Sequence, residues 1–193
     1  KEQFPVRIVS EEHGIIDMMS NPQFLGRLDG LDGSSVYKKS RGRGRYGTML
    51  DIALGLDPQY REYIAGGIME HAAQRLYCYA KEKGAYLVLQ NGEKTRIRSA
   101  GKIKLQHARV YADTVWKWKL PPEKYWHKLD AIGVPYWMTG SSAIAYVDIA
   151  TGEAHINLEY TRKDNLEIAV AYGLLKEAGA VLIDGRTGQN IGE

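Results

Sequence analysis

Several residue types and patterns are scarce in this 193-residue chain, and each scarcity excludes a class of protein. Cys78 is the only cysteine, so no internal disulfide can form and a reducing, cytoplasmic setting is expected. No run of about 18 apolar residues occurs, which argues against a membrane span, and no signal-peptide pattern opens the sequence. With 44% hydrophobic and 25% charged residues, the composition is that of an ordinary globular protein with its own core.

The net charge of +3 is small, and the basic residues concentrate in one run that glycines interrupt. That run contains Lys38, Lys39, Arg41, Arg43 and Arg45. Only Tyr37 and Tyr46 stand nearby for base stacking, and no matching basic stripe occurs elsewhere, so binding to nucleic acid is not favoured. A solvated loop that attracts an anionic substrate is the preferred interpretation.

Apolar segments and turn signals predict strands first, then alternating helices and strands. The predicted strands of the first half are 5–10, 24–28, 48–54, 63–69, 75–80 and 85–89, with 29–47 as a turn-rich segment. The second half is expected to hold helices at 111–120, 123–132, 141–150 and 164–178, and strands at 134–138, 154–158 and 180–183. This order favours a layered α+β architecture.

Two carboxylates lie three residues apart at the end of a predicted strand, in the sequence LDGLDGSS of residues 28–35. The glycines force a turn that can aim Asp29, Asp32 and the Leu31 carbonyl at one point, and Mg²⁺ prefers such oxygen ligands. The small residues 33–35 offer backbone N–H groups that suit a phosphate oxygen. The alternative is a solvated Asx-type turn, because Asp-Gly is common in loops.

Other acidic residues have ordinary explanations when they are taken singly. Glu11 and Glu12 follow the first strand and could be surface charges. Asp164 opens the longest predicted helix, where a carboxylate is favourable as an N-terminal cap. The five histidines are scattered and show no zinc-ligand spacing.

Four motifs in the same order along the chain resemble those of the inositol monophosphatase and fructose-1,6-bisphosphatase superfamily. Residues 10–12 (SEE) are similar to its Glu-Glu motif, and residues 29–34 (DGLDGS) to Asp-Pro-(Ile/Leu)-Asp-Gly-(Thr/Ser). Residues 140–145 (GSSAIA) with 150–152 (ATG) resemble its Gly-Ser-Ala-Ala segment. Asp164, followed by Ile168-Ala169 and by 177–180 (EAGA), resembles its final helix.

The resemblance implies a layered αβαβα sandwich and a metal-dependent phosphatase. Its halves would be 1–110, which holds metal and phosphate, and 111–193, which holds the substrate, packed as one compact unit. The metal ligands would be Glu11, Asp29, Asp32, Asp164 and the Leu31 carbonyl, around two or three Mg²⁺ ions, with Mn²⁺ as a substitute. Water would attack phosphorus directly, with Glu11, Asp32 and Ser34 as catalytic residues.

The resemblance also implies a substrate site and an assembly. Gly33, Ser34 and Ser35 would hold the phosphate, and Gly140, Ser141, Ser142 and Arg162 the rest of the substrate. No Trp precedes Asp164, which makes the chain more similar to archaeal enzymes that accept inositol phosphate and fructose bisphosphate. A homodimer acting on a small phosphorylated sugar or inositol, without membrane or nucleic acid, is the expected assembly.

Two departures from the family pattern keep other functions open. Gly30 stands where the family has Pro, and the sequence begins about ten residues before Glu11, where the family has two further helices. The sequence would then be a fragment, or the helices would come from another chain, or the homologue would have lost full activity. One alternative is therefore a catalytically silent homologue that acts as a binding or interaction protein. Another is a 3′(2′),5′-bisphosphate nucleotidase, which nothing in the basic run excludes.

Overall fold

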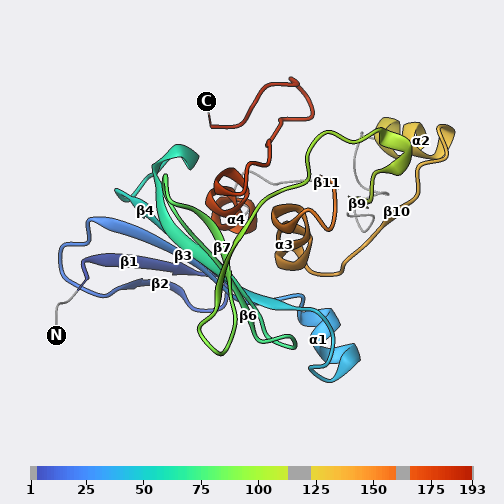
Figure 1. The fold of residues 1–193 in the computed structure, drawn as a ribbon. Helices are drawn as coiled ribbons and strands as arrows, with labels where there is room; N and C mark the ends of the chain where they lie inside the picture. Colours follow the sequence, from blue (N-terminus) through green and yellow to red (C-terminus); the bar gives the residue numbers. More distant parts are fainter. Residues whose placement is uncertain (1–3, 113–122, 160–165, 193) are drawn as a thin grey trace.

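The computed structural model describes residues 4–112, 123–159 and 166–192, and in this part of the chain two β-sheets alternate with helices (Figure 1). The strands of the large sheet are β1 (Val6–Ser10), β2 (Gly14–Asp17), β3 (Phe24–Asp32), β4 (Gly47–Leu54), β5 (Tyr63–Glu70), β6 (Arg75–Ala80), β7 (Gly84–Val88) and β8 (Lys94–Ile97). The small sheet contains β9 (Val110–Ala112), β10 (Tyr136–Trp137) and β11 (Ile156–Leu158). The helices are α1 (Ser34–Ser40), α2 (Glu123–Ala131), α3 (Ser142–Thr151) and α4 (Leu166–Glu177), with 3-10 turns η1 (Tyr60–Glu62) and η2 (Leu105–His107).

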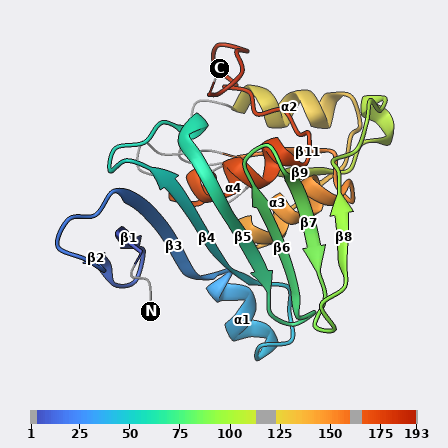
Figure 2. The same cartoon turned by 60° about the vertical axis from the view of Figure 1, so that its left-hand side comes forward.

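The large sheet has the order β2-β1-β3-β4-β5-β6-β7-β8 and is antiparallel except for the parallel pair β1 and β3 (Figure 2). Successive strands from β3 onward are neighbours because most of their connections are short, as is usual for antiparallel sheets. Burial alternates along β4, with Met49, Asp51 and Ala53 buried and Leu50 and Leu54 exposed. This period of two shows that only one face of the sheet lies against the core.

Helices α3 and α4 cover that face (Figure 1). Met49, Ile68 and Tyr77 of the sheet pack against apolar residues of both helices. Gly173 of α4 allows the closest approach, since a Cβ there would overlap the ring of Tyr79. Both helices are apolar around most of their circumference because they are buried between two sheets.

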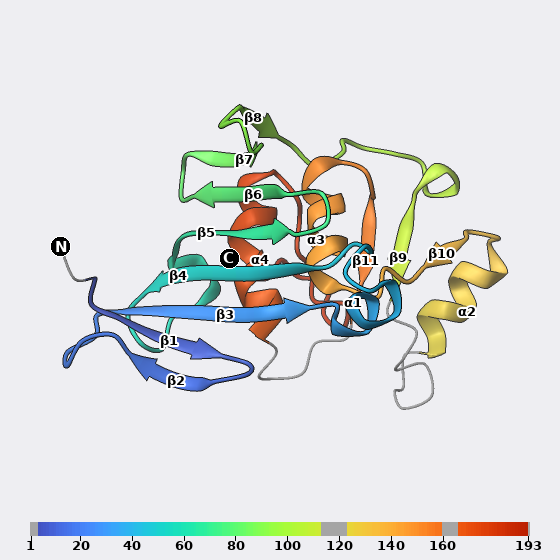
Figure 3. The same ribbon diagram turned by 90° about the horizontal axis from the view of Figure 1, so that it is seen from below.

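The small sheet is parallel, with the order β10-β9-β11, and separates α2 from α3 (Figure 3). Its own core contains Val110, Leu129 of α2 and Val134. The layers therefore follow the order α2, small sheet, α3 with α4, large sheet, which confirms the predicted layered α+β architecture. Within the described residues, these are four of the five layers of the predicted αβαβα sandwich. No helix among these residues has the length and apolarity needed to cross a membrane.

Arg45 connects the layers through charged hydrogen bonds. Its Nε donates to Oε1 of Glu70 on β5 at 2.6 Å, and its two Nη atoms donate to Asp148 of α3 at 2.9 and 2.8 Å. The hydroxyl of Tyr111 on β9 donates to the same Asp148 at 2.8 Å. This cluster joins the large sheet, α3 and the small sheet beside the ends of the strands.

Some predicted elements differ from those observed. The predicted turn at Asp29 is wrong, because β3 continues through Asp32, and α1 follows in the segment predicted to be turn-rich. Tyr111, predicted to start a helix, lies in β9, whereas 113–120 of that predicted helix lie outside the described residues. The predicted strand 180–183 makes a single bridge, from Ile183 to Asn190.

Candidate metal and phosphate site

Three carboxylates from two distant parts of the chain meet at the end of β3. Asp29, Asp32 and Glu167, in the first turn of α4, each offer an oxygen, and these oxygens lie within 4.8 Å of one another. Asp29 is 1% exposed and Asp32 7%. In a regular strand, residues three apart point to opposite faces. The register between β3 and β4 shifts between Asp29 and Asp32, and this irregularity allows both side chains to reach the same point.

The electrostatics of this cluster favour a cation. Burial raises the pKa of Asp29 to about 7, and the charges of Asp32, Glu11 and Glu167 contribute in the same direction. Burial also raises the pKa of Asp32, against the lowering effect of its hydrogen bonds. A set of oxygen-only, partly buried carboxylates with mutual repulsion is the chemistry that a hard divalent ion such as Mg²⁺ neutralises. The residues present therefore fit a Mg²⁺ site.

Asp32 also anchors the start of α3. It accepts hydrogen bonds from the Ser141 hydroxyl, from the Ser142 N–H at 3.2 Å and from the Ala143 N–H at 2.8 Å. A carboxylate at a helix N-terminus satisfies N–H groups that have no partner within the helix. The segment predicted to contact substrate, Gly140 to Ser142, is thus held directly against the carboxylate cluster.

The predicted phosphate segment lies beside the same cluster. Gly33 caps α1 with a φ of 82°, a left-handed conformation that favours glycine. A Cβ at Gly33 would stand 2.8 Å from the Cβ of Ser141, so only glycine permits this approach of the β3 end to α3. Ser34 and Ser35 follow in the first turn of α1, where both are exposed.

The two glutamates after β1, Glu11 and Glu12, approach the end of β3 in different ways. The charge of Glu11 acts on Asp29, but Glu11 is not one of the three residues whose oxygens lie within 4.8 Å of one another. The Glu12 side chain accepts hydrogen bonds from the Ser10 hydroxyl at 3.2 Å and from the Gly30 N–H at 3.3 Å. Glu11 thus lies near the cluster, while Glu12 supports the backbone between its members.

One member of the carboxylate cluster was missed by the sequence analysis, and two predicted site residues, Asp164 and Arg162, lie outside the described residues. Glu167 was missed, although it lies near the start of the predicted helix 164–178. Glu159, directly after β11, was not singled out in the sequence either; it accepts hydrogen bonds from the buried Tyr146 hydroxyl and from Asn157 Nδ2 at 3.3 Å. The charges of Glu159, Glu167 and Asp32 all raise the pKa of Tyr146, after the larger effect of burial.

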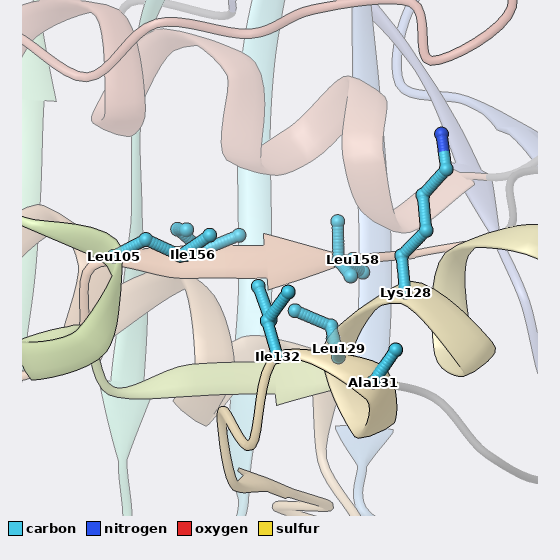
Figure 4. Close-up of a pocket in the computed structure, with 7 residues that line it drawn as sticks. All are labelled: Leu105, Lys128, Leu129, Ala131, Ile132, Ile156 and Leu158. Carbon is cyan, nitrogen blue, oxygen red and sulfur yellow. The ribbon is translucent and has the colours of Figure 1, made fainter.

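An apolar hollow of about 420 Å³ lies elsewhere, between α2, η2 and β11 (Figure 4). It is lined by Leu105, Lys128, Leu129, Ala131, Ile132, Ile156 and Leu158. None of these residues carries a carboxylate, and Lys128 is the only charged one. The hollow therefore lacks the groups needed for metal or phosphoryl chemistry.

No protein-family signature matches the sequence, and no curated protein matches it. Solved structures do match. Staphylococcal SaIMPase-II with inositol monophosphate bound has a TM-score of 0.75 and 16% identity, over 96% of this chain and 67% of that one. Its 2′-AMP complex has a TM-score of 0.72 and 17% identity, over 90% of this chain and 62% of that one.

Two further solved structures share the arrangement. Mycobacterium tuberculosis SuhB has a TM-score of 0.67 and 21% identity, over 96% of this chain and 69% of that one. An IMPase/NADP phosphatase complexed with Mg²⁺ and phosphate has a TM-score of 0.65 and 17% identity, over 89% of this chain and 59% of that one. The chain thus has the fold of inositol monophosphatase-type sugar phosphatases, and it spans about three fifths to two thirds of the length of these proteins.

Proposed function

We propose that this protein is a Mg²⁺-dependent phosphomonoesterase. The observation that carries the proposal is the meeting of Asp29, Asp32 and Glu167 beside the N-termini of α1 and α3. Carboxylates suit the metal, and helix N-termini suit the phosphate. The shared fold with a phosphatase crystallised with Mg²⁺ and phosphate supports the same chemistry.

In the proposed reaction the chain mainly binds and orients. Asp29, Asp32 and Glu167 would hold Mg²⁺, together with Glu11, Asp164 and the Leu31 carbonyl. The ion would supply positive charge at the phosphate and a bound water of lowered pKa. Gly33, Ser34 and Ser35 would hold the phosphate through backbone N–H groups, and the Ser34 hydroxyl would orient the attacking water.

The alcohol part of the substrate would lie next to the cluster, beside the start of α3. Gly140, Ser141 and Ser142 would contact it there, and Arg162 is proposed as a further contact. Glu159 is held in place by Tyr146, so its carboxylate could accept hydrogen bonds from substrate hydroxyls. Inositol-1-phosphate and fructose-1,6-bisphosphate are the proposed substrates, and the proposed assembly is a homodimer. Within each chain, residues 1–110 would hold the phosphate and most of the metal ligands, whereas residues 111–193 would bind the substrate and add Asp164 and Glu167 to the metal site.

A bisphosphate nucleotidase is a second candidate, favoured by one specific observation. α1 begins within the proposed phosphate segment, and Lys38, Lys39, Arg41 and Arg43 are exposed in the helix or just beyond it. Such cations would attract a substrate with a second phosphate. The 2′-AMP complex of SaIMPase-II shows a nucleotide bound by this fold.

The test is phosphate release from inositol-1-phosphate, fructose-1,6-bisphosphate and 3′-phosphoadenosine 5′-phosphate, each with and without Mg²⁺. Release only with Mg²⁺ would support the phosphatase, and the preferred substrate would separate the candidates. Mg²⁺ binding without release from any of the three would favour a silent binding protein.

A further inference from the structure

The backbone between the two aspartates is held by side chains from other strands. Gly30 lies between Asp29 and Asp32, where no ring or Cβ restricts the chain. Its N–H donates to Glu12, and its carbonyl accepts from the Thr48 hydroxyl at 2.7 Å. The next N–H, of Leu31, donates to Oδ1 of Asp29 at 3.0 Å. The conformation of this irregular part of β3 therefore depends on hydrogen bonds.

The Thr48 hydroxyl has a second partner, Nε2 of His71, at 2.8 Å. A hydroxyl has one hydrogen, and a carbonyl oxygen can only accept, so that hydrogen points to Gly30. His71 Nε2 must then carry a hydrogen and donate it to Thr48. The result is a directed chain from His71 through Thr48 to the Gly30 carbonyl.

The imidazole is itself held in place. His71 follows directly after β5, and its backbone N–H donates to the Tyr46 carbonyl at 3.2 Å. Its ring stacks on the Tyr46 ring, with centroids 5.3 Å apart and planes 29° apart. Because Thr48 lies on β4, three neighbouring strand ends contribute to one hydrogen-bonded chain.

We propose that Thr48 and His71 are positioning residues for the metal site, a proposal that rests on the proposed function. By holding the Gly30 carbonyl, they keep Asp29, the Leu31 carbonyl and Asp32 in one arrangement before the ion binds. Groups that orient metal ligands through hydrogen bonds strongly affect metal affinity. Loss of the Thr48 hydroxyl should therefore weaken Mg²⁺ binding by about 10-fold.

The experiment measures the Kd for Mg²⁺ by calorimetry and the melting temperature without metal. T48V keeps the shape and loses the hydroxyl, whereas T48S keeps the hydroxyl. H71F keeps a ring on Tyr46 and loses the donor. T95V, an exposed threonine of β8, is the matched control. T48V should bind Mg²⁺ about 10-fold more weakly, T48S and T95V like the wild type, and H71F in between.

A double variant tests whether the two residues act as one chain. T48V/H71F should bind Mg²⁺ no more weakly than T48V, because Thr48 transmits the effect of His71. T48V with wild-type Mg²⁺ affinity and only a lower melting temperature would overturn the proposal, as would equal weakening in T48V and T48S. If T48V fails to fold, H71F with wild-type affinity overturns it. A wild-type protein that binds no Mg²⁺ would instead refute the proposed function.

Discussion

Replacement of Asp29 by asparagine should stabilise the metal-free protein while it abolishes the effect of Mg²⁺. Asn has the same shape as Asp, and its side-chain oxygen can still accept the Leu31 N–H. What changes is the charge, in a cluster where Asp32 and Glu167 offer oxygens within 4.8 Å. The substitution therefore isolates the cost of keeping a carboxylate at this position without a cation.

The size of the effect follows from the pKa. Folding raises the pKa of Asp29 from 3.8 to about 7, mainly by burial. The folded state then binds more protons than the unfolded state, so this group makes the metal-free protein less stable as the pH rises from about 4 to 7. Above pH 7 the full cost is about 4 kcal/mol. Asparagine avoids it but buries an amide N–H group at about 1–3 kcal/mol, which leaves a net gain of about 1–3 kcal/mol.

Thermal unfolding with and without Mg²⁺, at pH 5 and pH 8, measures both the cost of the Asp29 charge in the metal-free protein and the stabilisation by Mg²⁺. At pH 8 without metal, D29N should melt about 2–10 °C above the wild type, and at pH 5 this advantage should vanish. Mg²⁺ should stabilise the wild type more at pH 8 than at pH 5, because protons compete for Asp29, and should not stabilise D29N. D57N, at an exposed turn, is the control and should match the wild type. A D29N protein that is less stable than the wild type at pH 8 without metal would refute the reasoning.

Two further substitutions test the packing that supports the site. R45M leaves the Glu70 and Asp148 side chains, which are 2% and 3% exposed, without their cation. The free energy of unfolding, measured in urea, should therefore fall by about 3–5 kcal/mol. A loss below about 1 kcal/mol would mean that the Arg45 cluster is not needed for stability. G173A places a methyl group against the Tyr79 ring and should cost about 1–3 kcal/mol in the same assay, because α4 must move away from the sheet. An unchanged stability of G173A would contradict the close helix–sheet packing.

The pairing of Asp29 with Asp32 could be predicted from the sequence because both lie in one short segment with glycines. The irregular register that brings them to one side could not, since it depends on how β3 pairs with β4. The segment 34–40 lies in a stretch predicted to be turn-rich, yet it forms α1. A helix this short derives its stability from its contacts rather than from its own sequence.

The residues that the sequence analysis missed are connected to the site by long-range contacts. Tyr146 and Glu159 meet because α3 and β11 are adjacent, and neither residue belongs to a recognisable spacing. Glu167 was overlooked because Asp164 had already been assigned as the acidic residue at the start of the predicted helix. Thr48 reaches Gly30 from β4, and His71, directly after β5, reaches Thr48, so only the register of the sheet shows their connection.

The most direct test of the central claim is phosphate release from inositol-1-phosphate by the wild type and by D32N, with increasing Mg²⁺. Phosphate release should require Mg²⁺ in the wild type and should fall by about 100-fold or more in D32N, while both proteins unfold cooperatively. Release that is unaffected by removal of Mg²⁺, or equal in the two proteins, would contradict a metal-dependent phosphatase built on the carboxylates at the end of β3.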